Sequence, residues 1–297
     1  IAKSANIIPT QLEFVDIAGL VRGASKGEGL GNQFLANIRE TDAIVHVLRC
    51  FEDGDITHVD GSVDPVRDAE TIETELMLAD MESLEKRVPA LQKKARSNDK
   101  DAKLALDLIE RALVVLRDGQ PARVVEINGE DEEKAFRMLQ LLTSKPILYA
   151  CNVDEDSAAE GNELSAKVAE MAAAQGARSV VISAAIESEV ALLESAEDKK
   201  EFLEGLGLEE TGLARVIREG YKLLKLLTFF TVGPKEARAW TVHEGATAPN
   251  AAGVIHTDFE RGFIKAETIA YDDFIEFNGE AGARDNGKLR QEGKTYI

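Results

Sequence analysis

The pattern of apolar and polar positions predicts an alternating order of strands and helices in the first part of the chain. Residues 11–16 alternate, and residues 43–51 form a largely apolar run, so both predict strands. A glycine-containing loop and a short helix over residues 32–40 separate them. This order is typical of a parallel sheet, and the apolar runs at residues 145–152 and 178–182 predict further strands of the same sheet.

Between the two parts of this predicted sheet, apolar residues recur three or four positions apart over two long stretches. Asp64 is a suitable N-cap, and Pro65 stands at the first helical position, where its missing N–H costs nothing. Residues 98–99 predict a turn, after which the helical period continues as far as Gly119. We expect two long antiparallel helices that bury these stripes against each other; two separate surface helices packed on the sheet are the alternative.

From about Leu227 the pattern changes to short apolar runs broken by Gly, Pro and Asn, which predicts a small β-rich domain. Its aromatic residues have strand spacing, so core packing is the favoured role and base stacking the weaker one. The sequence therefore predicts α/β organisation in five segments: a sheet domain of residues 1–66 and 141–205, a helical insertion of residues 67–140, a helical linker of residues 206–224 and a C-terminal domain of residues 225–297.

Composition and net charge indicate the cellular compartment and argue against membrane and DNA as partners. No run approaches the ~20 apolar residues of a membrane span, so no membrane partner is expected. The formal net charge of −19 argues against general polyanion binding, DNA included, but permits a local basic patch. Cys50 and Cys151 fall in apolar strands and are predicted to be buried thiols in a reducing compartment, which favours a cytoplasmic protein.

Polar motifs follow three of the predicted strands. In the first, Asp16-Ile-Ala-Gly19, the carboxylate can hold the shell of a Mg²⁺ ion and the glycine amide can meet a γ-phosphate. The second is Asn152-Val-Asp-Glu155, and the third is Ser183-Ala-Ala185. Since the carboxyl ends of parallel strands meet at one edge, the three motifs together predict a nucleotide site.

The second motif bears on which base is bound. Guanine-binding relatives of this class place Asn-Lys-x-Asp here, and that Asp accepts from the guanine edge. This chain has Val153 in place of the Lys and the longer Glu155 in place of the Asp. We therefore expect Asn152, Val153 and Glu155 to accept adenine, with Ser183 and Ala184 closing the pocket. A GTP-binding protein is the alternative.

Longer runs around these motifs resemble the YchF/Obg-like ATPase family. The run from Asp16 to Asn32 is similar to that family's switch region, in which Gly19 would sense the γ-phosphate, and the switch would rearrange at Gly23, Gly27, Gly29 and Gly31. Residues 152–155 and 183–187 also resemble the family, and residues 238–241, 245–249 and 255–263 resemble its TGS domain. The resemblance implies a P-loop NTPase of the Obg type, an inserted helical hairpin, a C-terminal β-grasp (TGS) domain, Mg²⁺-dependent ATP hydrolysis and association with ribosomes.

One departure from the family concerns the phosphate loop. No Gly-x-x-x-x-Gly-Lys-Ser run occurs in the 297 residues. The resemblance implies about 55 further residues before Ile1, where this loop would stand, and about a dozen after Ile297. Because the loop supplies the backbone cradle and the phosphate lysine, we expect the fragment alone to bind nucleotide poorly and to be inactive.

The catalytic group is predicted by elimination. Leu20 stands where Ras-like enzymes carry the Gln that positions water, and an apolar side chain cannot do this. His58, in the polar loop after the second strand, is the candidate, and the resemblance supports it; a solvated loop histidine is the alternative. His46 lies within an apolar strand and is expected in the core, and His243 and His256 show no metal-binding pattern.

Two other functions compete with an ATPase. Gly27-Glu-Gly-Leu-Gly31 before a helix is consistent with a dinucleotide site, but the twelve residues between Gly19 and Asn32 exceed the tight turn which that site requires. The other alternative is a non-enzymatic adaptor with a degenerate nucleotide domain.

A basic cluster at the predicted turn between the long helices bears on the ribosome. Lys93, Lys94 and Arg96, with Lys100 and Lys103 nearby, could contact the phosphate backbone of ribosomal RNA. Asp99 and Asp101 dilute the cluster, so a role in solvating the helix end is the alternative.

Overall fold

The structure is a computed structural model that describes residues 3–17, 30–54 and 61–297. The chain forms two compact units, Ile1–Glu13 with Lys225–Ile297, and Phe14–Leu224. Within the described ranges, no helix is both long enough and apolar enough to cross a bilayer.

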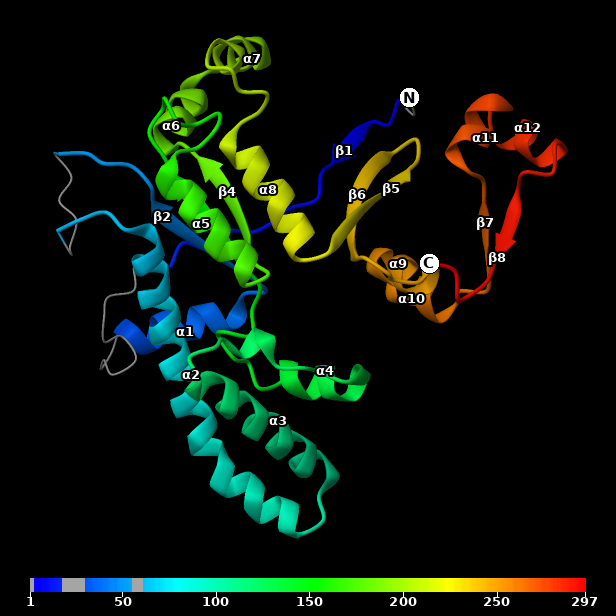
Figure 1. The fold of residues 1–297 in the computed structure, drawn as a ribbon. Coiled ribbons are helices and arrows are strands. Elements are labelled where there is room, and N and C mark those ends of the chain that lie inside the picture. Colours follow the sequence, from blue (N-terminus) through cyan, green and yellow to red (C-terminus); the bar gives the residue numbers. More distant parts are fainter. Residues whose placement is uncertain (1–2, 18–29, 55–60) are drawn as a thin grey trace. The chain divides into compact units, whose positions relative to one another are not determined.

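The larger unit is built on a parallel sheet (Figure 1). Its strands are β2 (Ile44–Arg49), β3 (Ile147–Asn152) and β4 (Arg178–Ile182), in the order β2-β3-β4. Ile44 pairs with Ile147, and Leu148 pairs with Arg178. The strands predicted over residues 43–51, 145–152 and 178–182 are confirmed; the first two are shorter than predicted, and the third has the predicted bounds.

Helices cover both faces of this sheet. Tyr149 and Cys151 of β3 point to one face, where Ala69 of helix α2 (Pro65–Arg96) and Val168 of α5 (Glu163–Ala174) pack on them. Leu148 of β3 points to the other face, toward Val216 of α8 (Gly212–Leu223). A central strand buried on both faces needs a continuous apolar run, and β3 has one. The predicted burial of Cys50 and Cys151 is confirmed, at 0% and 1% exposure.

Helix α8 (Gly212–Leu223) was predicted as part of a linker but packs on β3 and β4. Its apolar side, with Val216 and Leu223, faces the sheet and not solvent. It follows α6 (Ala184–Leu192) and α7 (Ala196–Gly205). The helix is therefore a structural layer of the larger unit.

The two long helices predicted around residues 98–99 are α2 (Pro65–Arg96) and α3 (Lys100–Arg117). Asp64 caps α2 by accepting from the Arg67 amide at 3.1 Å, as predicted. At the turn, Asn98 adopts a φ of 66°, in the left-handed region that Asn tolerates better than most residues.

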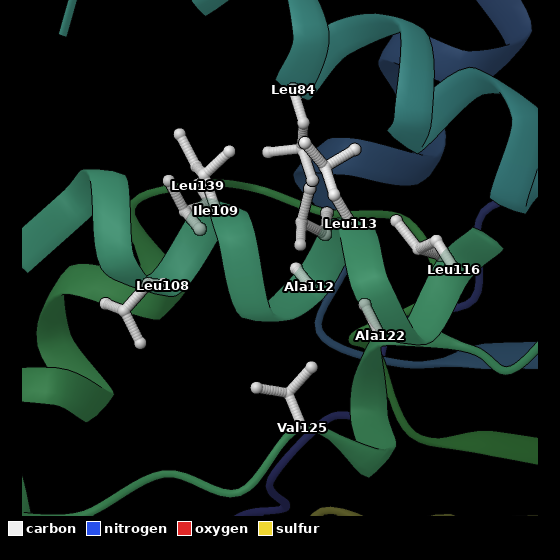
Figure 2. Close-up of a cluster of buried hydrophobic side chains, with 10 residues drawn as sticks. Leu84, Leu108, Ile109, Ala112, Leu113, Leu116, Ala122, Val125 and Leu139 are labelled. Carbon is white, nitrogen blue, oxygen red and sulfur yellow. The ribbon is translucent and has the colours of Figure 1, made fainter. Parts of the chain in front are cut away.

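The distal parts of α2 and α3 form an arm with its own core (Figure 2). Leu84 of α2 lies toward Ile109 and Leu113 of α3, Leu108 belongs to the same cluster but points away from Leu84, and the segment after α3 adds Ala122. That segment contains the short 3-10 helix η2 (Ala122–Val124) and α4 (Gly129–Arg137). The prediction of an antiparallel pair is confirmed here, and the alternative of two separate surface helices is wrong for this part.

The first half of α2 does not belong to the arm, although the predicted insertion began at residue 67. Leu76 and Ala79 are buried against Leu35 and Ile38 of α1 (Leu30–Glu40), beside the sheet. One 32-residue helix therefore runs from the sheet domain into the arm.

Among the described residues, the strand predicted over residues 11–16 is absent, because those residues join no ladder. Instead β1 (Asn6–Ile8) pairs in parallel with β6 (Glu236–His243) of the smaller unit. Phe14 and Val15 are 49% and 54% exposed. Alternation is compatible with a strand, but only a hydrogen-bonded neighbour makes one. The prediction that residues 1–66 lie entirely in the sheet domain is therefore wrong for residues 3–13.

The smaller unit has less strand than predicted. β5 (Leu226–Val232) pairs antiparallel with β6, and β7 (Ala266–Thr268) pairs with β8 (Arg290–Glu292). Short helices occupy much of the rest: α9 (Ala248–Ile255), α10 (Thr257–Arg261), α11 (Tyr271–Glu276) and α12 (Glu280–Asp285). Val254, Ile255 and Phe274, which belong to the short apolar runs that predicted a β-rich domain, are helical. A Thr247–Asn250 capping box starts α9, a signal that the prediction overlooked.

Candidate functional site

The carboxyl ends of β3 and β4 bring the second and third motifs together. Asn152 ends β3, and its side-chain Oδ1 accepts a hydrogen bond from the Ala184 amide at 2.9 Å. The Val153 amide donates to the Ile182 carbonyl at 2.9 Å. Four of the five predicted base-pocket residues, Asn152, Val153, Ser183 and Ala184, therefore lie at one edge of the sheet.

Ser183 is the unusual residue of this edge. It is the N-cap of α6, yet its side chain makes no capping bond. The residue is 3% exposed, and its Oγ finds no hydrogen-bond partner among the described residues. Buried hydroxyls nearly always have a hydrogen-bond partner. The unpaired Ser183 hydroxyl, at the edge where the two motifs meet, is consistent with a ligand that supplies this hydrogen bond.

The loop after β3 is held in a compact turn. The Asp154 carboxylate accepts from the Ser157 amide at 2.9 Å, and the Glu155 carbonyl accepts from the Ala158 amide at 3.2 Å. The Glu155 side chain is exposed and, within the described ranges, makes no hydrogen bond or ion pair. Its carboxylate is thus not brought to the Asn152–Ala184 contact, although it lies on the same loop.

Three residues anchor these loops, and only Glu187, the last residue of the run 183–187, fell within a motif of the sequence analysis. Asn162 donates from Nδ2 to the Cys50 carbonyl at 2.6 Å, joining the end of β2 to the start of α5. Glu187 accepts from the amides of the first turn of α8, and Arg215 of α8 donates to the Ala158 carbonyl. Of the two residues that the sequence analysis missed, only Asn162 had a local signal, the capping box that it forms with Ser165 at the start of α5.

Asp16 and the switch glycines contribute less to the described site. Asp16 is exposed and follows no strand, so its predicted place at a strand end is wrong. Gly31 lies in the first turn of α1. Gly19, Gly23, Gly27, Gly29 and His58 lie outside the described residues.

No protein-only metal centre exists in the part of the chain that the structure describes, since no group of three or more His, Cys, Asp or Glu side chains could hold an ion. Mg²⁺ in nucleotide sites usually binds one or two carboxylates together with substrate phosphates and water. A single exposed carboxylate such as Asp16 fits that requirement.

A polar cluster lies on the face of the sheet that α2 and α5 cover. Tyr149 donates to Gln175 Oε1 at 3.1 Å, and burial raises the pKa of Tyr149 to about 12. The His46 ring lies 5.9 Å from the Tyr149 ring. Burial lowers the pKa of His46 to about 4, against an opposing effect of the Asp68 charge. His46 is therefore neutral near pH 7, but it is half-buried and does not lie fully in the core as predicted.

The predicted basic cluster lies at the arm tip (residues 93–103). Lys93, Lys94 and Arg96 occupy the exposed last turn of α2. Among described residues, none of these three side chains, nor that of Lys100, forms an ion pair or hydrogen bond. By contrast, Arg117, farther from the tip, is paired with Glu85 at 2.8 Å.

The parallel sheet, with two loop motifs in hydrogen-bond contact at its carboxyl edge, is typical of a nucleotide-binding α/β domain, and the comparisons identify this domain as one of the P-loop class. A family model described as 50S ribosome-binding GTPase matches residues 2–79. A second model, for the C-terminal region of YchF GTPases and described as a protein of unknown function, matches residues 226–297.

Relatives match along the whole chain. The ribosome-binding ATPase YchF of Haemophilus influenzae is 58% identical over 297 residues, 100% of this chain and 81% of the relative. That of Bacillus subtilis is 53% identical over 292 residues, 98% of this chain and 79% of the relative. A solved structure of the Schizosaccharomyces pombe YchF GTPase matches with a TM-score of 0.84 and 35% identity, covering 100% of this chain and 80% of that one. The chain belongs to the YchF family.

Proposed function

We propose that this protein binds and hydrolyses ATP and acts on ribosomes as a nucleotide-dependent regulator in the cytoplasm. The observation that carries the proposal is the edge where Asn152 contacts Ala184 beside the unpaired hydroxyl of Ser183. At that edge a buried polar group lacks a partner, as expected of a site that a ligand completes. The bacterial relatives are named ribosome-binding ATPases, which supports both parts of the proposal.

ATP is preferred over GTP in this proposal because of the loop after β3. Glu155 is exposed and stands where a guanine-reading Asp would be required, and buried Val153 replaces the Lys. The solved Schizosaccharomyces pombe relative is nevertheless named a GTPase, so GTP remains the second candidate.

For the phosphate side, we propose that Asp16 orders the water shell of a Mg²⁺ ion held chiefly by the nucleotide phosphates. His58 is the proposed group that orients the attacking water, in place of the Gln that Leu20 replaces. Gly19 would sense the γ-phosphate through its amide.

Ribosome contact is proposed at the arm tip, where Lys93, Lys94 and Arg96 are exposed without ion pairs among the described residues. Unpaired cations on an acidic chain would direct contact with phosphate to one place. For the smaller unit we propose a TGS-like role, docking on protein or structured RNA.

The experiment that tests the nucleotide proposal is calorimetric titration with MgATP and MgGTP, applied both to the full natural protein that contains these residues and to residues 1–297 alone. We expect the full protein to prefer ATP and the 297 residues to bind weakly. Preference for GTP would keep the fold class and overturn the base assignment. Binding of neither nucleotide by the full protein would favour the non-enzymatic adaptor.

A further inference from the structure

The first turn of α8 contacts both loops of the proposed base pocket. On one side stands Glu187, one turn after Ser183 in α6. Its Oε1 accepts from the Gly212 amide at 2.6 Å, and its Oε2 accepts from the Leu213 amide at 3.2 Å. A carboxylate that accepts two otherwise unpaired amides at a helix start is also favoured by the helix dipole.

Close approach at this contact depends on the absence of a side chain at position 212. A Cβ atom on Gly212 would stand 3.1 Å from Glu187 Oε1 and 3.1 Å from Ile182 Cγ2, closer than side chains normally pack. The end of β4, the first turn of α6 and the first turn of α8 therefore meet without spare room.

On the other side stands Arg215, one turn farther along α8. Both terminal nitrogens of its guanidinium lie 3.4 Å from the Ala158 carbonyl, at the end of the turn that contains Glu155. Ala158 itself is 2% exposed and packs on Ile186 of α6. The loop after β3 is thus attached to α8 through its backbone and to α6 through its apolar side chain.

We infer that Glu187 and Arg215 are positioning residues for base recognition, which set the spacing of the two base loops through the first turn of α8. The inference rests on the proposed nucleotide binding. Neither side chain is part of the Asn152–Ala184 contact, so each acts through the loop it holds. Base recognition depends on where Asn152, Glu155 and Ser183 stand relative to one another, and small displacements weaken such recognition strongly.

The test separates base recognition from phosphate binding. Affinities for ATP, GTP and inorganic triphosphate are measured on the full natural protein for Glu187→Gln and Arg215→Met. Glu189→Gln and Arg218→Met are matched controls on the same two helices, because Glu189 is exposed and Arg218 pairs outward with Glu210. We expect the ATP-to-GTP affinity ratio to fall by about three- to tenfold in the first pair, while triphosphate affinity and both controls stay near wild type.

Several outcomes would overturn the inference. An unchanged ratio in both positioning variants, with wild-type ATP affinity, would leave the proposed function standing and remove the role of Glu187 and Arg215. An equal loss for ATP, GTP and triphosphate, with a lower melting temperature, would mean that the two residues only stabilise the domain. If Arg215→Met does not fold, the ATP-to-GTP affinity ratio is measured on Arg215→Lys instead, which keeps the charge. Failure of the wild type to bind any nucleotide would instead overturn the proposed function itself.

Discussion

The two halves of α2 are held in opposite ways, although both are rich in charged residues. In the root half (residues 65–80), Asp80 is 1% exposed and accepts from the amides of Leu142 and Thr143, both at 2.8 Å, and from the Thr143 hydroxyl at 2.7 Å. Glu73 forms a 2.5 Å ion pair with Arg123 in which both side chains are largely buried. Each of these polar groups replaces lost water with a specific partner.

In the distal half (residues 81–96), most charges face solvent, although half-buried Arg87 donates to the Leu139 carbonyl at 3.0 Å. Glu82 and Lys86 pair at 2.6 Å with more than half of each side chain exposed, and so do Glu85 and Arg117 across the two helices at 2.8 Å. Exposed pairs contribute little to stability. Buried charges at the root of α2 anchor the helix to its neighbours, whereas exposed charges toward the tip serve solubility or recognition. The degree of burial therefore decides the role of a charged residue along this helix.

The largest effect should come from Asp80. Asp80→Ala leaves two buried amides and a buried hydroxyl without their acceptor, and we expect a loss of roughly 3–5 kcal/mol in the free energy of unfolding. Urea unfolding followed by circular dichroism measures it. Glu82→Ala, on the same helix but in an exposed pair, is the control and should leave the free energy of unfolding nearly unchanged. A similar loss in both variants would contradict the difference between the halves.

A smaller effect should appear on acidification, through His46 beside the root half. Its pKa is lowered to about 4 in the folded protein from 6.5, because burial disfavours the charged ring. The unfolded chain then binds the proton more tightly, so stability is full above pH 6.5 and is lost as the pH falls toward 4. The shift corresponds to at most roughly 3 kcal/mol.

Comparison of His46→Gln with the wild type between about pH 7 and pH 4 isolates this contribution. We expect the variant to lose less stability over that range, measured by urea unfolding at each pH. His243→Gln, at an exposed position in the smaller unit, is the control and should follow the wild type. If His46→Gln and the wild type lose stability in parallel, His46 is not the group that titrates.

Sequence patterns identified what depends on local periodicity. The continuous apolar run of β3, the Asp64–Pro65 start of α2 and the turn at residues 98–99 all correspond to elements of the structure. The motifs at Asn152 and Ser183 were placed together because adjacent parallel strands end at one edge.

What the sequence could not show are interactions between residues far apart in the chain. Asp80 meets Thr143, and Arg215 meets Ala158, through pairings that have no period or spacing. The wrong prediction of a strand at residues 11–16 has the same cause. Alternation indicates that a segment can form a strand, but it does not show which neighbouring strand would pair with it. The helices of the smaller unit were missed because apolar runs this short are compatible with both structures.

The smallest effect on stability should come from the arm tip, where the effect on binding should be large. Replacing Lys93, Lys94 and Arg96 together by Gln removes exposed charges without ion pairs among the described residues, so the free energy of unfolding should hardly change. Co-sedimentation with ribosomes should weaken, and the slope of log affinity against log salt should decrease by about 0.7 to 0.9 for each phosphate that the variant no longer neutralises.

The matched control replaces Lys86, Lys134 and Arg137, whose exposed side chains are paired with Glu82, Glu130 and Glu133. Both triple variants lower the net charge equally, from −19 to −22 (−19 − 3). An equal loss of ribosome binding in both would therefore assign the effect to total charge, whereas a loss confined to the first would assign it to the tip.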